Sequence, residues 1–282
     1  MTRRLLDAGY AVNVWNRSPE KCAPFRGTQT HICATPAEAA ADADFVLMCL
    51  LDTDAVERTV FGLHGVTETI RRDCAVVDFS TISAPWVKTA DAKLRAATGA
   101  RWIDAPVSGG VGGASAGTLT IFLGGDDAAV AAATPVLRHL GQRLTHFGPT
   151  GSGLAVKMCN QAIVASHIAI IAEAVSLAEH EGLDPSRVVE ALRGGWADST
   201  LLGIFGPRFA TGTDAPPLGQ IYTMLKDIGM VTEMAEAAEC PMPVATAAAT
   251  VYRNVAEAGH LERDLTALMS FFRSAAKPDR RD

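Results

Sequence analysis

Short runs of apolar residues alternate with helix-like segments through the first half of the chain. The strand candidates are bounded by Gly, Pro, Asp or Ser, and they cover residues 11–15, 45–51, 75–79, 101–104 and 119–123. Helical patterns cover 18–25, 36–42, 53–61 and 84–97. Continuous apolar strands that alternate with helices predict a mostly parallel sheet with both faces covered, which is a doubly wound α/β domain.

The strand signals stop after about Phe147, and the segment from Gly148 to Gly153 combines glycine, proline and serine, which break regular structure. Beyond it, one helix is predicted over 153–181. Because residues 162–178 are apolar on most faces, we expect this helix to be buried on all sides, as the central helix of an all-helical domain. Further helices are predicted around 185–193, 218–238, 244–258 and 264–273.

Composition and charge narrow the function classes. The chain has 282 residues with 25 basic and 31 acidic side chains, a net charge of −6, so a nucleic-acid partner is not expected. Ser166, His167 and Glu173 interrupt its most apolar stretch, which therefore predicts a buried helix and not a membrane span. The six cysteines form no C-x-x-C pair, which predicts reduced thiols and no metal site. With no signal-peptide pattern at the N-terminus, these features predict a cytoplasmic protein.

The first segment with candidate chemistry, Val14-Trp-Asn-Arg-Ser18, lies at the end of the predicted 11–15 strand. In a dinucleotide-binding domain, an acidic residue at this place binds the adenosine ribose diol. An Asn-Arg pair would instead leave room for a 2′-phosphate, with Arg17 as its partner. An ordinary polar strand end explains the segment equally well.

A second segment, Asp104-Ala-Pro-Val-Ser-Gly-Gly-Val-Gly-Gly, follows a strand. It is therefore expected at the carboxyl edge of the sheet, where open α/β folds bind ligands. The hydroxyl of Ser108 and the backbone N–H groups of Gly109 and Gly110 would suit a carboxylate. On glycine content alone, a flexible loop is the more economical interpretation.

The third segment, Gly151-Ser-Gly-Leu-Ala-Val-Lys-Met-Cys-Asn-Gln161, opens the long helix. Lys157 is expected near the helix N-terminus, where the dipole and partial burial both disfavour its charged form, so it is suited to donate and accept a proton. Asn160 and Gln161 follow on the same helix face. A surface lysine is the usual interpretation, but the long apolar helix behind Lys157 weakens it. A fourth segment, Leu225-Lys-Asp-Ile-Gly229, is by itself typical of a solvated charge pair.

Taken together, in their order and spacing, these segments resemble the β-hydroxyacid dehydrogenase family. The motifs that carry the resemblance are Asp-x-Pro-Val-Ser-Gly-Gly, Gly-x-Gly-x-x-x-Lys-x-x-Asn and Lys-Asp-Ile-Gly, and the resemblance runs from Met1 to about Phe272. It implies an NAD(P)-dependent oxidoreductase that interconverts a short β-hydroxy acid and its semialdehyde. It also implies a Rossmann-type dinucleotide-binding domain over residues 1–150 and an all-helical substrate and dimerisation domain over 151–282.

The resemblance also assigns roles to residues. Lys157 would be the catalytic acid/base. The substrate, a small carboxylate, would be bound by Ser108, Gly109, Gly110, Asn160 and Gln161. The cofactor would be bound by Asn16, Arg17, Ser18, Leu50, Leu51, Thr81 and Lys226. NADP is the expected cofactor, with NADPH preferred and NAD as the alternative, and a homodimer or homotetramer is the expected assembly.

Two features qualify what the resemblance implies. Within the family, residues 157–161 and 193–200 look most like tartronate semialdehyde (2-hydroxy-3-oxopropionate) reductases, with a 3-hydroxyisobutyrate dehydrogenase-like enzyme as the alternative. Family members also begin with a strand and a G-x-G-x-x-G loop, which holds a pyrophosphate. The chain contains no G-x-G-x-x-G, and its first nine residues look like the remainder of the first helix, so we expect that strand and loop upstream of Met1. A truncated, non-catalytic remnant is therefore a further alternative.

Overall fold

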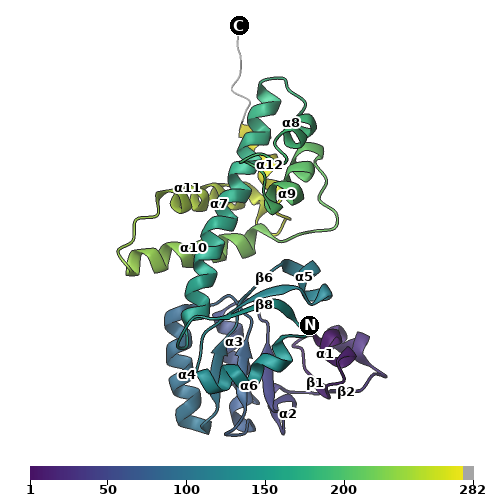
Figure 1. The fold of residues 1–282 in the computed structure, drawn as a ribbon, viewed down its shortest axis with the longest axis vertical. Coiled ribbons are helices and arrows are strands. Elements are labelled where there is room, and N and C mark those ends of the chain that lie inside the picture. The colour runs from purple at the N-terminus through teal and green to yellow at the C-terminus, as the bar shows by residue number, and fades with distance from the viewer. Residues whose placement is uncertain (276–282) are drawn as a thin grey trace. The chain divides into compact units, whose positions relative to one another are not determined.

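The fold was analysed in a computed structural model that describes residues 1–275. Its backbone contacts divide into an N-terminal unit, Met1–Lys157, and a C-terminal unit, Met158–Asp282. Figure 1 shows that the first unit mixes strands and helices, whereas the second is built from helices. This agrees with the predicted succession of a doubly wound α/β domain and an all-helical domain.

The N-terminal unit alternates strands and helices along the chain (Figure 1). Its strands are β1 (Val12–Val14), β2 (Thr30–Ile32), β3 (Phe45–Met48), β4 (Ala75–Asp78), β5 (Arg101–Asp104), β6 (Val107–Ser108), β7 (Leu119–Leu123) and β8 (Gly141–His146). Its helices are α1 (Thr2–Asp7), α2 (Pro36–Ala40), α3 (Thr53–Phe61), α4 (Ala84–Thr98), α5 (Gly110–Ala116) and α6 (Asp127–Leu137). Short 3₁₀ segments lie at Pro19–Phe25 and Val66–Glu68.

The strands pair mostly in parallel. β1 pairs with β2, β3-β4-β5 form a parallel sheet, and β7 pairs in parallel with β8 and antiparallel with β6. Met48 lies opposite Asp78, which lies opposite Asp104, so β3, β4 and β5 end at one edge of their sheet. Every residue of β4 is buried, as expected for a strand covered on both faces. The loops that follow these three strands are thereby brought to the same edge.

The C-terminal unit has its own core. Its helices are α7 (Ser152–His180, which begins in the N-terminal unit), α8 (Pro185–Ala191), α9 (Thr200–Thr211), α10 (Ile221–Ala237), α11 (Pro243–Val255) and α12 (Ala267–Ala275), with a π-helical turn at Ala256–His260. Phe209, Ile228 and Tyr252 are completely buried among these helices. The Tyr252 hydroxyl donates to the backbone oxygen of Ala165 in α7 at 3.1 Å, so the one polar atom of this side chain is satisfied.

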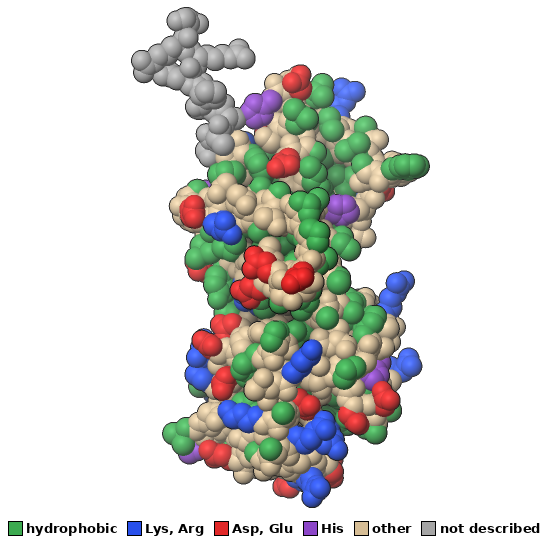
Figure 2. Space-filling model, turned by 90° about the vertical axis from the view of Figure 1, so that its left-hand side faces the viewer, with side chains coloured by type: hydrophobic (Ala, Val, Ile, Leu, Met, Phe, Trp, Pro, Cys, Tyr) green, Lys and Arg blue, Asp and Glu red, His purple; other side chains and the backbone are tan. Residues whose placement is uncertain are grey.

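The prediction that the long helix is buried on all sides is wrong for the single chain. Ile163, Ile170 and Leu177 are 63%, 54% and 63% exposed, and their spacing of seven residues places them in one stripe along α7. Hydrophobic side chains also reach the surface of the helical unit in Figure 2. By length and composition alone α7 could cross a membrane, but 56% of its most apolar window is buried, and core helices pass the same test. The apolar residues of α7 therefore lie partly on a buried face and partly in an exposed stripe.

Candidate functional site

Hydrogen bonds join the loops that follow β3 and β4. The Leu50 N–H donates to Ser80 Oγ at 2.8 Å, and the Ser80 N–H donates to Asp78 Oδ1 at 2.9 Å. Two of the predicted cofactor-binding residues flank this link, because Leu51 follows Leu50 and is half exposed while Thr81 follows Ser80 and is half-buried. The structure therefore brings Leu50, Leu51 and Thr81 together at the carboxyl edge.

Asp78 accepts the Ser80 N–H at this edge and is itself 1% exposed. Its Oδ2 has no hydrogen-bond partner among residues 1–275. Burial raises the pKa of Asp78 to about 7, the hydrogen bonds from Ser80 lower it, and the charge of Asp104 adds to the rise. The carboxyl is therefore protonated in an appreciable fraction of molecules near neutral pH.

This burial predicts a pH-dependent stability. A pKa of about 7 in the folded protein lies above the ordinary value near 3.9, so the folded state binds the proton more tightly than the unfolded state. The stability from this group is present below about pH 4 and is lost as pH rises to about 7, by at most about 4 kcal/mol. In Asp78→Asn, the free energy of unfolding should fall much less between pH 5 and pH 8. Urea unfolding across that range measures it, with Asp73→Asn as an exposed control that keeps the wild-type slope. An unchanged slope in Asp78→Asn contradicts the prediction.

Lys157 lies in the second turn of α7 and is 6% exposed. Its Nζ donates to the backbone oxygen of Val107 at 2.9 Å, and Val107 immediately precedes Ser108. Gly109 and Gly110 follow with φ of 123° and 61°, in the region that favours glycine, and no atom lies within 4 Å of the place where a Cβ of Gly110 would be. The predicted acid/base group and the predicted carboxylate loop are thus held together within the N-terminal unit.

In the C-terminal unit, the other candidate residues form a connected chain of polar contacts. Asn160 Nδ2 donates to Gln161 Oε1 at 2.8 Å, and Gln161 Nε2 donates to Asp227 Oδ2 at 2.6 Å. The second oxygen of Asp227 lies 3.2 Å from Lys226 Nζ. Gln161 and Asp227 are 6% and 5% exposed, so Gln161 orients the Asn160 amide from within the protein. The contact of Asn160 and Gln161 with substrate stays a prediction.

The segment Asn16–Ser18 follows the carboxyl end of β1. Asn16 Oδ1 accepts the Ser18 N–H at 2.9 Å, so the asparagine shapes the turn into the following 3₁₀ segment. Arg17 is exposed, and no acidic side chain among residues 1–275 forms an ion pair with it. Its guanidinium is thus available to an anion such as a phosphate group.

These placements fit a dinucleotide, which binds across the carboxyl ends of parallel strands. Arg17, after β1, would hold the adenosine end, and Leu50, Leu51 and Thr81 lie at the edge where β3 and β4 end. Asp78, whose Oδ2 has no hydrogen-bond partner in the described part of the chain, ends β4 just before Thr81. When bound, such a cofactor supplies a hydride acceptor or donor.

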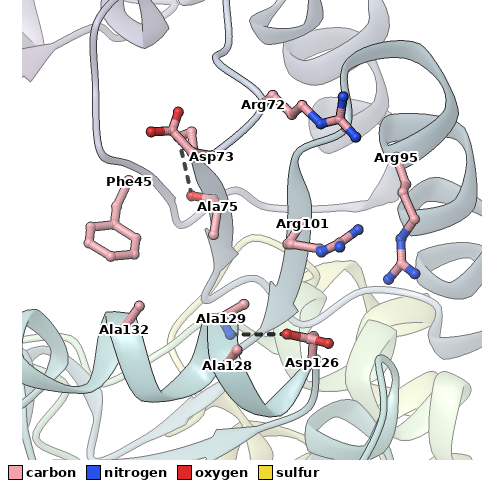
Figure 3. A pocket seen from close by; sticks show the side chains of 12 residues that line it. Phe45, Arg72, Asp73, Ala75, Arg95, Arg101, Asp126, Ala128, Ala129 and Ala132 are labelled. Atoms are coloured by element: carbon pink, nitrogen blue, oxygen red, sulfur yellow. Dashed lines mark hydrogen bonds between the residues drawn. The ribbon is translucent and has the colours of Figure 1, made fainter.

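A cavity of about 780 Å³ lies elsewhere in the N-terminal unit. Phe45, Ala75 and Arg101, the first residues of β3, β4 and β5, line it, so it opens at the amino ends of these strands. Figure 3 shows Arg72, Arg95 and Arg101 around it. It lies at the opposite edge from the candidate site.

A group of three possible metal ligands, His31, Cys33 and Glu38, lies with ligand atoms within 4.8 Å of one another. Glu38 Oε2 accepts the Ala34 N–H at 2.7 Å, and the Glu38 N–H donates to Thr35 Oγ1 at 3.1 Å. The first of these bonds holds the residue before the N-cap, and the second is the N-cap hydrogen bond of Thr35 at the start of α2. Helix capping is therefore sufficient to explain the position of Glu38.

Three residues of the site have no role that the sequence predicts, namely Asp78, Ser80 and Asp104 through its side chain. Asp78 ends the otherwise apolar strand β4, Asp104 follows the buried Trp102 and Ile103 in β5, and both aspartates are 1% exposed. A carboxylate at the end of a buried strand is a signal that a partner must satisfy it. The residue that satisfies each carboxylate can be identified only from the tertiary structure.

Comparisons with known proteins identify the family of the chain. Residues 1–148 match the family model described as the NAD binding domain of 6-phosphogluconate dehydrogenase. Residues 151–272 match the model described as NAD-binding of NADP-dependent 3-hydroxyisobutyrate dehydrogenase. The mitochondrial 3-hydroxyisobutyrate dehydrogenase of Drosophila melanogaster is 31% identical over 272 residues, covering 94% of this chain and 83% of that protein.

Two solved structures show the same fold along nearly the whole chain. A 3-hydroxyisobutyrate dehydrogenase from Salmonella typhimurium is similar with a TM-score of 0.86 and 27% identity, covering 95% of this chain and 93% of that one. The Mycobacterium tuberculosis 3-hydroxyisobutyrate dehydrogenase with L-serine has a TM-score of 0.76 and 30% identity, covering 96% and 93%. The chain therefore belongs to the β-hydroxyacid dehydrogenase family, the NAD(P)-dependent oxidoreductases related to 3-hydroxyisobutyrate dehydrogenase.

Proposed function

We propose that this protein interconverts a short β-hydroxy acid and its semialdehyde, with tartronate semialdehyde as the leading substrate and NADPH as the preferred cofactor. The observation that carries the proposal is the buried Lys157, whose Nζ is held by Val107 beside the Ser108–Gly110 loop. A proton donor next to a carboxylate-binding loop is the arrangement that the reduction of an aldehyde acid requires.

The chain's own residues supply positioning and a proton. Ser108 Oγ and the N–H groups of Gly109 and Gly110 hold the substrate carboxylate, which places the aldehyde next to Lys157. Lys157 Nζ gives a proton to the oxygen that becomes the alcohol, and takes it back in the reverse direction. The resemblance also assigns Asn160 to the substrate, and Gln161 orients its amide.

The Mycobacterium tuberculosis relative bound to L-serine supports this substrate class. Serine is a three-carbon acid with a hydroxyl on its β-carbon, and the alcohol formed from tartronate semialdehyde has the same carboxylate and β-hydroxyl. The choice of tartronate semialdehyde rests on the likeness of residues 157–161 and 193–200, and 3-hydroxyisobutyrate is the alternative substrate.

A paired assay tests the proposal. Reduction of tartronate semialdehyde and oxidation of 3-hydroxyisobutyrate are followed by nicotinamide absorbance with each cofactor, and the proposal requires the higher kcat/KM for tartronate semialdehyde with NADPH. A higher value for 3-hydroxyisobutyrate would favour the dehydrogenase alternative. If neither reaction occurs and NADPH leaves the melting temperature unchanged, the chain is the non-catalytic alternative.

Cofactor preference provides a separate prediction. Because Arg17 is exposed and has no carboxylate partner among residues 1–275, it is expected to pair with the 2′-phosphate that only NADPH carries. Arg17→Ala should raise the KM for NADPH by about tenfold or more, since a hydrogen-bonded charge pair contributes about 1.5–3 kcal/mol. NADH lacks the phosphate and is the control. Equal increases in KM for both cofactors would show that Arg17 does not recognise the 2′-phosphate.

We also expect a homodimer or homotetramer. The stripe of Ile163, Ile170 and Leu177 leaves apolar area in water along α7, and a second chain could cover it. Light scattering at micromolar concentration should give at least twice the mass of one chain, and Ile170→Glu should lower that mass. A wild-type protein that is monomeric under these conditions contradicts the expectation.

A further inference from the structure

Asp104 connects the end of β5 with the start of α7. Its Oδ1 accepts the Gly151 N–H at 2.7 Å, and its Oδ2 accepts the Leu154 N–H at 2.8 Å. The first N–H groups of a helix have no acceptors within the helix. Asp104, about fifty residues earlier in the chain and 1% exposed, therefore caps α7 with both carboxylate oxygens.

The backbone around Asp104 is fixed as firmly as its side chain. Asp104 and Gly124 exchange two backbone hydrogen bonds, at 3.0 Å and 2.8 Å. The Phe122 N–H donates to the oxygen of Pro106 at 3.0 Å, and Ser108 pairs with Thr120 in β7. The segment that leads from Asp104 to Ser108 is therefore held against β7 along its length.

Lys157 makes a second link between α7 and the 104–108 segment. It lies one helical turn beyond Leu154, and its Nζ donates to Val107. The start of α7 is thus tied to the 104–108 segment at two places, through the Asp104 carboxylate and through the Lys157 ammonium. Both ties lie within the N-terminal unit.

Glycines leave the room that this connection needs. A Cβ on Gly153 would lie 2.8 Å from the Asp104 backbone oxygen and 2.9 Å from Oδ2, and one on Gly124 would lie 2.7 Å from the Gly153 nitrogen. These distances are shorter than van der Waals contacts, and the neighbouring atoms are buried. The backbone at Gly124 and Gly153 therefore encloses the Asp104 carboxylate closely, so a shift of Asp104 would displace the start of α7.

We propose that Asp104 is a positioning residue, whose carboxylate sets where Lys157 Nζ lies relative to the Ser108–Gly110 loop. The inference rests on the proposed function, because it concerns the distance between the proton donor and the substrate carboxylate. A displacement of about 1 Å between reacting groups can cost about 100-fold in rate. Asp104 acts only through Lys157 and the loop.

Asp104→Asn tests the proposal with little change in size. Its amide group would meet one backbone N–H donor with another donor, so the first turn of α7 should move. We expect kcat to fall about 10- to 100-fold while the KM for the cofactor stays within about twofold. Asp104→Glu should not restore kcat, because the enclosed space has no room for a longer side chain.

Asp91→Asn is the matched control. Asp91 Oδ1 accepts the Trp102 N–H at 3.2 Å, towards the other end of the same strand β5, and in the described residues Asp91 has no hydrogen bond or ion pair with α7. This variant should lose stability but keep kcat within about twofold of wild type. The proposal is overturned if folded Asp104→Asn, assayed well below its melting temperature, keeps kcat within threefold of wild type.

A measurement on the wild-type protein covers the case in which the variants do not fold. Hydrogen exchange of the Gly151 and Leu154 amides should be as slow as that of the buried amides in β4 and β5, because a rigid connection opens only with the unit as a whole. Rapid local exchange at these two amides would also overturn the proposal. Absence of wild-type turnover with slow exchange at both amides would instead refute the proposed function alone.

Discussion

Lys157→Ala should lower kcat by about 10²- to 10⁴-fold, which is the usual contribution of a positioned general acid or base. Lys157 is buried, its Nζ is bound to Val107, and Ser108–Gly110 follow directly. The binding of NADPH should change by less than about twofold, because Arg17, Leu51 and Thr81 lie on other elements. Steady-state turnover together with calorimetric titration of NADPH separates the two effects.

Two further variants show whether proton transfer is the cause. Lys157→Arg keeps a positive charge, but a guanidinium does not release its proton at neutral pH, so its kcat should remain as low as that of the alanine variant. Lys93→Ala removes a lysine in α4 that pairs with Glu57, and it should leave kcat unchanged. Near-normal turnover in Lys157→Ala would remove Lys157 from the reaction.

Several elements with an apolar pattern could be predicted closely from the sequence, but the apolar helix α6 was not among them. The predicted strand 101–104 is β5, and the predicted helix 153–181 differs from α7 by one residue at each end. β8, Gly141–His146, could not be predicted, because this strand at the end of its sheet is mostly polar and half exposed. α5 could not be predicted either, because three of its seven residues are glycines and helix propensity argues against such a segment.

The candidate site divides in a similar way. Residues with distinctive chemistry in a motif, such as Lys157 and Ser108, could be proposed from their order and spacing. The partners that hold them could not, because Val107 contributes a backbone oxygen, which any residue carries. Asp104 contacts residues 47 and 50 positions away, and no local pattern predicts such a pair. Burial on α7 was also overestimated, because composition does not tell which apolar face the rest of the chain covers.

Gly153→Ala and Gly229→Ala should change stability in opposite directions, although both glycines lie in helices. Alanine is the better helix former by about 1 kcal/mol. At Gly229 in α10 no atom lies within 4 Å of the added Cβ, so the free energy of unfolding should rise by about 0.5–1 kcal/mol. At Gly153 the Cβ would press on the backbone oxygens of Phe122 and Asp104, neither of which can move without shifting a strand.

Overpacking of this kind usually costs about 1–3 kcal/mol, and we expect Gly153→Ala to lie at the upper end because the obstructing atoms are backbone. Relief of the contact would push the start of α7 away from the Asp104 carboxylate, so the stability loss should be accompanied by a lower kcat. Gly229→Ala should show no such loss of turnover. Urea unfolding and turnover measured on both variants test the two effects together. A stabilised Gly153→Ala with normal turnover would show that α7 does not approach Asp104 as closely as the structure describes.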